Sequence, residues 1–155
     1  MKSVVIFDSL YGNTRKIALA VAQNLLGQPT AIHVCDATPA SLAKFDFIVI
    51  GCPTHAGWPS EPCKKFLGSL PAGCLDGKRF AAFDTRMPNK DSNFFIRTVI
   101  NLFGFAGPRL AKALEAKGGK RVGEPAGFVV KAKEGPLEDG EVERAKEWAK
   151  QLGGQ

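Results

Sequence analysis

The chain has 155 residues, of which 45% are hydrophobic and 23% charged, so it is long enough to bury the core of one domain and lacks a disordered composition. Its net charge of +6 is carried by scattered basic residues without interleaved aromatic side chains, which gives no nucleic-acid-binding motif. The apolar run at residues 4–7 is too short for a secretory signal or a membrane span, so we expect a single cytoplasmic domain over residues 1–155 with no membrane or nucleic-acid partner.

Short apolar runs alternate with helical patterns along the chain. The runs lie at residues 4–7, 31–35, 47–50, 80–83 and 128–130. Continuous apolar runs of this length are typical of strands that are covered on both faces, as in a parallel sheet. The second run is interrupted by His33, as expected for a strand at the edge of the sheet.

Apolar residues at helical spacing predict helices between these strands. The first pattern comprises Ile17, Val21 and Leu25, and the last comprises Val142, Ala145, Ala149 and Leu152. Ser60 followed by Glu61 and Pro62 is a helix start. Together the elements predict a doubly wound α/β domain with a five-stranded parallel sheet in the order 2-1-3-4-5 and helices on both faces. In such a sheet, ligands bind beyond the carboxyl ends of the strands, at the switch point between strands 1 and 3.

The loop after the first strand carries a cluster of hydrogen-bond donors. Hydroxyl groups at Ser9, Tyr11 and Thr14 and the amide of Asn13 surround Gly12, directly before the first helix. A phosphate monoester needs several converging donors, and the backbone N–H groups of a helix N-terminus supply them with a favourable dipole. Gly12 allows the backbone to turn tightly beside the anion. The loop is neither a P-loop nor G-x-G-x-x-G, so a nucleoside triphosphate or a dinucleotide is not indicated.

This loop resembles the phosphate loop of the flavodoxin family. The resemblance implies a flavodoxin-like fold and one FMN, bound without a covalent bond, with its phosphate held by Ser9, Tyr11, Asn13 and Thr14 in the loop that also contains Leu10 and Gly12. Two departures stand out: Tyr11 replaces a small hydroxyl residue, and Arg15-Lys16 follow where an acidic residue is common. Neither departure removes the donors.

The loop after the third strand, residues 51–59, resembles the second flavin loop of the family. The resemblance implies a backbone turn against the isoalloxazine ring, formed by Pro53, Thr54, His55, Ala56 and Gly57. Trp58 offers a large aromatic face that can stack on the ring, or it packs over the start of the next helix. His55 either donates to the N5 or O4 edge of the flavin or caps a turn.

The loop after the fourth strand is expected to meet the pyrimidine edge of the flavin through Asp84, Thr85 and Arg86. Arg86 either stabilises negative charge on the reduced flavin or pairs with Asp84. The family typically supplies a tyrosine here, whereas the single tyrosine of this chain is Tyr11. Phe94 or Phe95 could substitute, although residues 93–105 are so apolar that they indicate deep packing or an interface.

The four cysteines, Cys35, Cys52, Cys63 and Cys74, form no C-x-x-C pair and no cluster with metal-ligand spacing. We therefore expect them to be reduced and mostly buried, and we expect no metal site. No protein residue is assigned a catalytic role, because the cofactor carries the redox chemistry.

Three functions remain open at this stage. The first is electron transfer through FMN to redox protein partners, whose surfaces should be acidic given the positive charge of this chain. The second is an NAD(P)H-dependent quinone or flavin reductase of the same fold. The third is a binding module that holds flavin without redox traffic. A phosphorylated receiver domain is excluded, because it needs an acidic residue after the third strand, where this chain has Cys52, Pro53 and Thr54.

Overall fold

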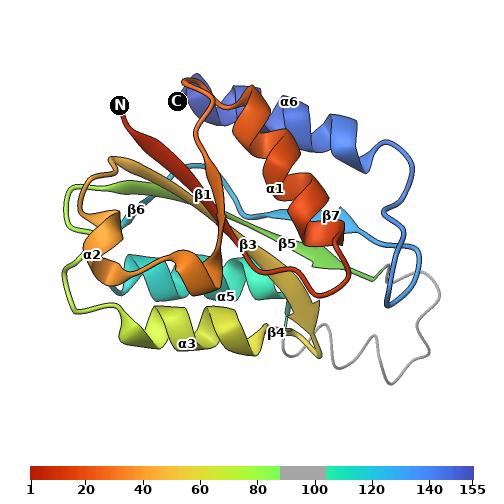
Figure 1. Cartoon of the computed structure of the whole chain (residues 1–155), viewed down its shortest axis with the longest axis horizontal. Coiled ribbons are helices and arrows are strands. Elements are labelled where there is room, and N and C mark those ends of the chain that lie inside the picture. The colour runs from red at the N-terminus through yellow and green to blue at the C-terminus, as the bar shows by residue number, and fades with distance from the viewer. Residues whose placement is uncertain (88–103) are drawn as a thin grey trace.

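The computed structural model describes residues 1–87 and 104–155, which form a central sheet with helices on both faces (Figure 1). The strands are β1 (Ser3–Phe7), β2 (Ala31–His33), β3 (Phe47–His55), β4 (Trp58–Pro59), β5 (Arg79–Arg86), β6 (Lys120–Arg121) and β7 (Ala126–Val129). The order is β2-β1-β3-β5-β6, and every one of these pairs is parallel. The predicted doubly wound sheet is therefore confirmed, with β2 at its edge.

The last strand position of the sheet is filled by two pieces of chain. β6 pairs with the beginning of β5, and β7 pairs with the end of β5, so both continue the order that the sequence predicted. The break between them contains Gly123, with a φ of 67°, and Pro125, which has no N–H to donate to a neighbouring strand. β4 is a further short strand, antiparallel to the end of β3.

The helices occupy two layers. They are α1 (Asn13–Asn24), α2 (Pro39–Leu42), α3 (Glu61–Ser69), α5 (Ala106–Glu115) and α6 (Glu141–Gly153). α1 and α6 cover one face of the sheet, and α2, α3 and α5 lie on the other (Figure 1). The predicted helix start at Ser60 is confirmed, because α3 begins at Glu61 with Pro62 in its first turn. The predicted strand over 31–35 ends at His33, since Val34–Asp36 form a 3-10 turn.

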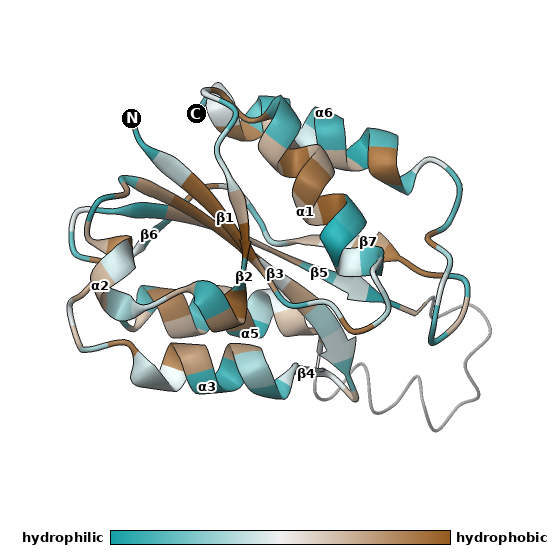
Figure 2. Cartoon of the chain, viewed as in Figure 1, coloured by the Kyte–Doolittle hydropathy of each residue, from teal (hydrophilic) through white to brown (hydrophobic). Residues whose placement is uncertain are grey.

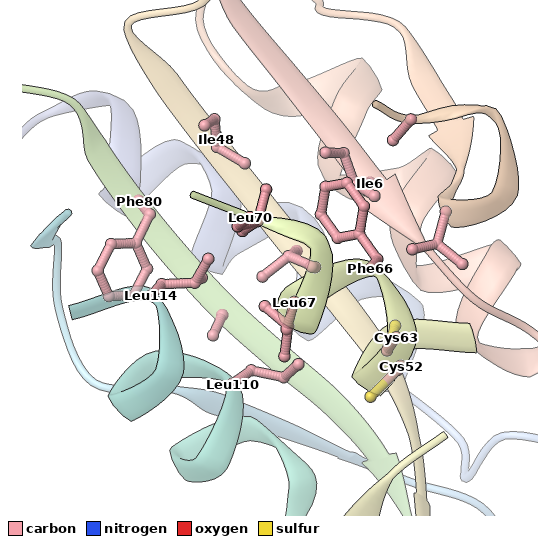
Figure 3. Close-up of a cluster of buried hydrophobic side chains, with 14 of the residues drawn as sticks. Ile6, Ile48, Cys52, Cys63, Phe66, Leu67, Leu70, Phe80, Leu110 and Leu114 are labelled. Atoms are coloured by element: carbon pink, nitrogen blue, oxygen red, sulfur yellow. The ribbon is translucent and has the colours of Figure 1, made fainter. Parts of the chain in front are cut away.

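Alternation along the central strands divides the core between the two layers. Figure 2 shows the middle of these strands as strongly hydrophobic. Ile6 and Ile48 point toward α3 and α5, where they pack with Phe66, Leu67 and Leu110 (Figure 3). Val5 and Val49 point the other way, toward α1 and α6. On that side the rings of Phe83, Phe128 and Trp148 contact one another edge to face, with centroids 6.0 Å apart. Burying apolar side chains on both faces fixes the two helical layers against the sheet.

The cysteines follow the prediction in part. Cys52 and Cys63 are buried side by side in the α3 layer, Cys74 is half-buried, and Cys35 is exposed (Figure 3). A hydrogen bond with Cys63, together with burial, raises the pKa of the Cys52 thiol far above its ordinary value, so this thiol stays protonated. Within residues 1–87 and 104–155, no group of histidine, cysteine or acidic side chains could hold a metal ion.

One sequence expectation falls on a segment that the structure describes only in part, and another concerns membrane spans. The apolar stretch at residues 93–105, with Phe94 and Phe95, lies outside the described residues except for Gly104 and Phe105. Of the helices that are described, none combines the length and the apolar character needed to cross a membrane.

Candidate cofactor site

A pocket of about 480 Å³ opens at the carboxyl edge of the sheet, where β1, β3, β5 and β7 end. Its lining residues come from the carboxyl ends of these four strands and from the segments that directly follow them: Ser9, Leu10, Tyr11, Asn13 and Thr14; Pro53, Thr54, His55 and Ala56; Thr85, Arg86 and Met87; and Val130 and Lys133. This is the switch point at which the sequence placed the ligand, and its volume is in the range of small-molecule sites. Four of the predicted site residues do not line the pocket, namely Gly12, Gly57, Trp58 and Asp84.

The first loop closes on itself through Ser9. The Ser9 hydroxyl oxygen accepts hydrogen bonds from the N–H groups of Gly12, at 3.1 Å, and Arg15, at 3.2 Å. Gly12 is not itself a lining residue; it turns the chain into α1 with a φ of 91°, which a residue with a Cβ rarely adopts. The hydroxyl hydrogen of Ser9 is left for a group in the pocket. The N-terminus of α1, with its positive dipole end and no acidic residue in the first turn, therefore faces a site suited to an anion.

Thr14 joins the first loop to the third. Its hydroxyl lies 2.8 Å from the hydroxyl of Thr85, and both side chains are buried. One hydroxyl hydrogen is used within this pair, so the second remains available to the pocket. The pair fixes the distance between two walls of the site.

The second loop is a tight hairpin between β3 and β4. Ala56 and Gly57, at its tip, have φ values of 49° and 86°, the positive values at both central positions that type I′ turns require. Thr54 fastens the loop to α5, because its hydroxyl oxygen accepts from the Ala106 N–H at 3.1 Å. The small apolar side chains of Pro53 and Ala56 line the pocket on this side.

Trp58 lies on the outer side of this hairpin. The guanidinium group of Arg109 stacks on its ring at 3.6 Å, while the Nε of Arg109 donates to the Gly57 carbonyl at 2.8 Å. The side chain of Trp58 is 46% exposed. Stacking of Trp58 on the cofactor therefore stays a prediction, and one face of the ring already carries Arg109.

The third loop is held by a buried ion pair. Asp84 is fully buried, and its two carboxylate oxygens accept from Nε and Nη2 of Arg86 at 2.7 and 2.6 Å. The N–H of Gly107 donates to the same carboxylate at 2.8 Å. Of the two roles considered for Arg86, the pair with Asp84 is the one present in the structure. Arg86 still lines the pocket, but its charge is offset by a carboxylate behind it.

Sequence reasoning missed three lining residues, namely Met87, Val130 and Lys133. Met87 directly follows the third loop. Val130 and Lys133 follow β7, whose carboxyl end lies at the same edge of the sheet as those of β1, β3 and β5. Ligands in such sheets bind beyond the carboxyl ends of the strands, which we call the edge rule. Applying the edge rule to every predicted strand, including the last, would have found this fourth loop.

An open parallel α/β sheet with a phosphate-suited loop at its switch point defines the class of flavodoxin-like mononucleotide-binding proteins. The sequence pattern of the flavodoxin domain matches residues 4–105. The chain belongs to the flavodoxin family, and FMN is its cofactor.

The relatives of the chain agree with this assignment. The flavodoxin of Aquifex aeolicus (strain VF5) is 34% identical over 116 residues, which are 67% of this chain and 62% of that protein. The aligned part is thus less than two thirds of the length of that relative. Among solved structures, oxidised Flavodoxin 2 from Bacillus cereus has a TM-score of 0.76 at 20% identity, covering 98% of this chain and 97% of its own. The flavodoxin of Streptococcus pneumonia TIGR4 has a TM-score of 0.75 at 19% identity and covers 99% of both chains.

Proposed function

We propose that this chain, as a single domain over residues 1–155, carries electrons through one FMN bound without a covalent bond in the pocket at the carboxyl edge of the sheet. The observation that carries the proposal is the meeting of four loops around one pocket of about 480 Å³ at the switch point. A flavin bound there supplies one- or two-electron chemistry, and the protein supplies binding, orientation and a controlled environment.

The residues around the pocket fit the two ends of FMN. At the end formed by the first loop, Ser9, Asn13 and Thr14 border the N-terminus of α1, and this donor set suits a phosphate. The lining also includes the apolar side chains of Leu10, Pro53, Ala56 and Met87, which suit a flat aromatic ring.

Polar groups at the ring end can orient the flavin. The paired Arg86 comes from the third loop, and Thr54 and His55 come from the second. Thr85 lies between the two ends, since its hydroxyl is 2.8 Å from that of Thr14. Gly12, Gly57 and Asp84 do not line the pocket, and they support the cofactor site by shaping its loops. Tyr11 is half exposed and lines the pocket, where its hydroxyl can add to the donors of the first loop.

Redox protein partners with acidic surfaces are part of the proposal. Its support is the net charge of +6 and the presence of Lys133 and Arg86 around the pocket. Opposite charge on a partner steers encounter and raises the association rate. A cytoplasmic location is proposed on the sequence reasoning given above.

The test is to load the purified protein with FMN and record its visible spectrum, and then to add NADH or NADPH. In a separate sample the flavin is reduced with dithionite, and the reduced protein is mixed with a one-electron acceptor protein. A carrier binds one FMN per chain, is not reduced by either nucleotide, and passes electrons to the acceptor. Rapid bleaching by a nucleotide with turnover of a quinone would identify a reductase instead. Binding of FMN without any electron transfer would leave only a flavin-binding module.

A further inference from the structure

The loop after β7 is folded back on itself and reaches the pocket. The Lys131 N–H donates to the Pro136 carbonyl at 2.8 Å, and the Glu138 N–H donates to the Val129 carbonyl at 2.8 Å. Between these bonds the Gly135 N–H donates to the Ala132 carbonyl at 2.9 Å. The tip of the loop, residues 132–135, is therefore a defined turn and not a loose connection.

Asn13 clamps this tip to the N-terminus of α1. Its Nδ2 donates to the Glu134 carbonyl at 3.1 Å. Gly135 lies so close that a Cβ at this position would be 2.6 Å from the Asn13 Oδ1, and its φ is 101°. A residue with a side chain would be strained there on both grounds. The contact holds the neighbouring Lys133 at the end of the pocket where the first loop begins α1.

Lys133 brings a positive charge to that end. It lines the pocket, and it forms no ion pair with any residue of the described ranges 1–87 and 104–155. The other basic side chain of the pocket, Arg86, is bound to Asp84, and the nearby Lys131 lies 3.4 Å from Asp139. The clamp uses only the backbone carbonyl of Glu134, whose exposed side chain does not line the pocket.

We propose that Lys133 is the counter-charge of the FMN phosphate, and that Asn13 is a positioning residue that holds Lys133 in place through the loop clamp. The inference rests on the proposed function, since it needs FMN in this pocket with its phosphate at the first loop. A phosphate monoester carries close to two negative charges at neutral pH, and an ammonium group within hydrogen-bond reach stabilises it by a charge-assisted bond.

The experiment compares FMN with riboflavin, which lacks the phosphate, by fluorescence titration of the full chain freed of flavin. Lys133→Met should weaken FMN binding about tenfold and leave riboflavin affinity within about twofold. Lys133→Arg should restore most of the FMN affinity. Lys131→Met is the matched control in the same loop, and it should change neither affinity. The FMN affinity of Lys133→Met should also depend less on salt than that of the parent.

Asn13→Ala tests the positioning role. It should weaken FMN but not riboflavin, and its effect should become smaller in the Lys133→Met background, because both changes remove the contribution of Lys133 and only the direct donation from Asn13 to the phosphate is left. The proposal is overturned if Lys133→Met weakens both ligands equally, if it leaves FMN affinity and its salt dependence unchanged, or if the two substitutions add fully. A parent that binds no flavin at all would instead refute the proposed function, and this inference with it.

Discussion

The carboxylate of Asp84 joins the end of β5 to the start of α5. It lies fully buried near the end of β5, accepts two hydrogen bonds from Arg86, and accepts a third from the N–H of Gly107 at the start of α5. The guanidinium group of Arg86 in turn lies 3.6 Å over the ring of Phe105. Because a buried charge is tolerated only when it is paired and hydrogen-bonded, these contacts depend on one another.

Asp84→Asn should lower the free energy of unfolding by about 2–4 kcal/mol, because the Arg86 guanidinium then keeps its charge without a carboxylate partner. Urea unfolding of the flavin-free protein measures this. Asp139→Asn is the control, since the 99% exposed side chain of Asp139 pairs with the exposed Lys131 and with no other residue that the structure describes. That change should stay within about 0.5 kcal/mol. Equal effects of the two substitutions would contradict the role given to Asp84.

The lowered pKa of Glu141 predicts that this residue contributes to stability in a pH-dependent way. Burial raises the pKa of its carboxyl, but hydrogen bonds from Arg144 and the Val129 N–H outweigh this, and the pKa lies below its ordinary value of 4.5. A depressed pKa in the folded state stabilises the protein fully above the ordinary value and loses that effect as the pH falls through the lowered pKa. The stability difference between the parent and Glu141→Gln should therefore be largest near neutral pH and shrink as the pH falls below 4.5. Unfolding in urea at a series of pH values measures it, and a difference that grows in acid would contradict the assignment.

Trp58 offers a test of the second loop. If its free face stacks on the flavin, Trp58→Ala should raise the fluorescence of bound flavin and weaken FMN binding by about 0.5–1.5 kcal/mol. Trp148, which packs against Phe83 and Phe128 in the core, serves as the internal reference for tryptophan emission. If Trp58→Ala leaves flavin emission and affinity unchanged, the residue acts only as the platform for Arg109.

At the scale of elements, the contact between β3 and β5 depends on a glycine. Gly51 is the register partner of Phe83, and a Cβ at Gly51 would overlap the Phe83 ring, which is itself packed against Phe128 and Trp148. The ring cannot move aside without disturbing this aromatic group. β3 leads directly into the second loop of the pocket, so the packing here also sets the position of the site.

Gly51→Ala should therefore destabilise the protein by about 1–3 kcal/mol through overpacking. Gly68→Ala in α3 is the matched control, because a Cβ there meets nothing within 4 Å. That substitution should stabilise the helix by about 0.5–1 kcal/mol. Thermal unfolding of both variants decides the matter, and a Gly51→Ala variant as stable as the parent would mean that the Phe83 ring is free to repack.

At the scale of the whole molecule, the net charge of +6 and the proposed acidic partners together predict how salt affects electron transfer. The rate constant for electron transfer to an acidic acceptor protein should fall about tenfold as salt rises from about 20 to about 300 mM, because screening removes the long-range attraction. Stopped-flow mixing of the reduced protein with an acidic and with a basic acceptor measures this. A basic acceptor should show the opposite trend, and equal salt dependence for both would rule out steering by net charge.

The sequence by itself determined the architecture and the location of the site. The apolar runs and the helical spacing of Ile17, Val21 and Leu25 are local patterns, and each element must bury its apolar face against the others. The strand order followed once the second run was placed at the edge, and the edge rule then pointed to the loops after the first, third and fourth strands. The donors from Ser9 to Thr14 lie within one short loop, so they could be read directly.

Only the tertiary structure decided what these side chains contact. Arg86 pairs with Asp84 while it lines the pocket, Trp58 carries Arg109, and the Asn13 amide reaches Glu134, which is 121 residues away in the chain. Lys133 had no local motif to distinguish it from the other scattered basic residues. A single hydrogen bond or ring contact of this kind contributes about 1 kcal/mol to the free energy of folding. It produces no repeating pattern in the sequence from which it could be predicted. The folded chain brings such partners together because burial of the two cores, on either face of the sheet, fixes where the loops must lie.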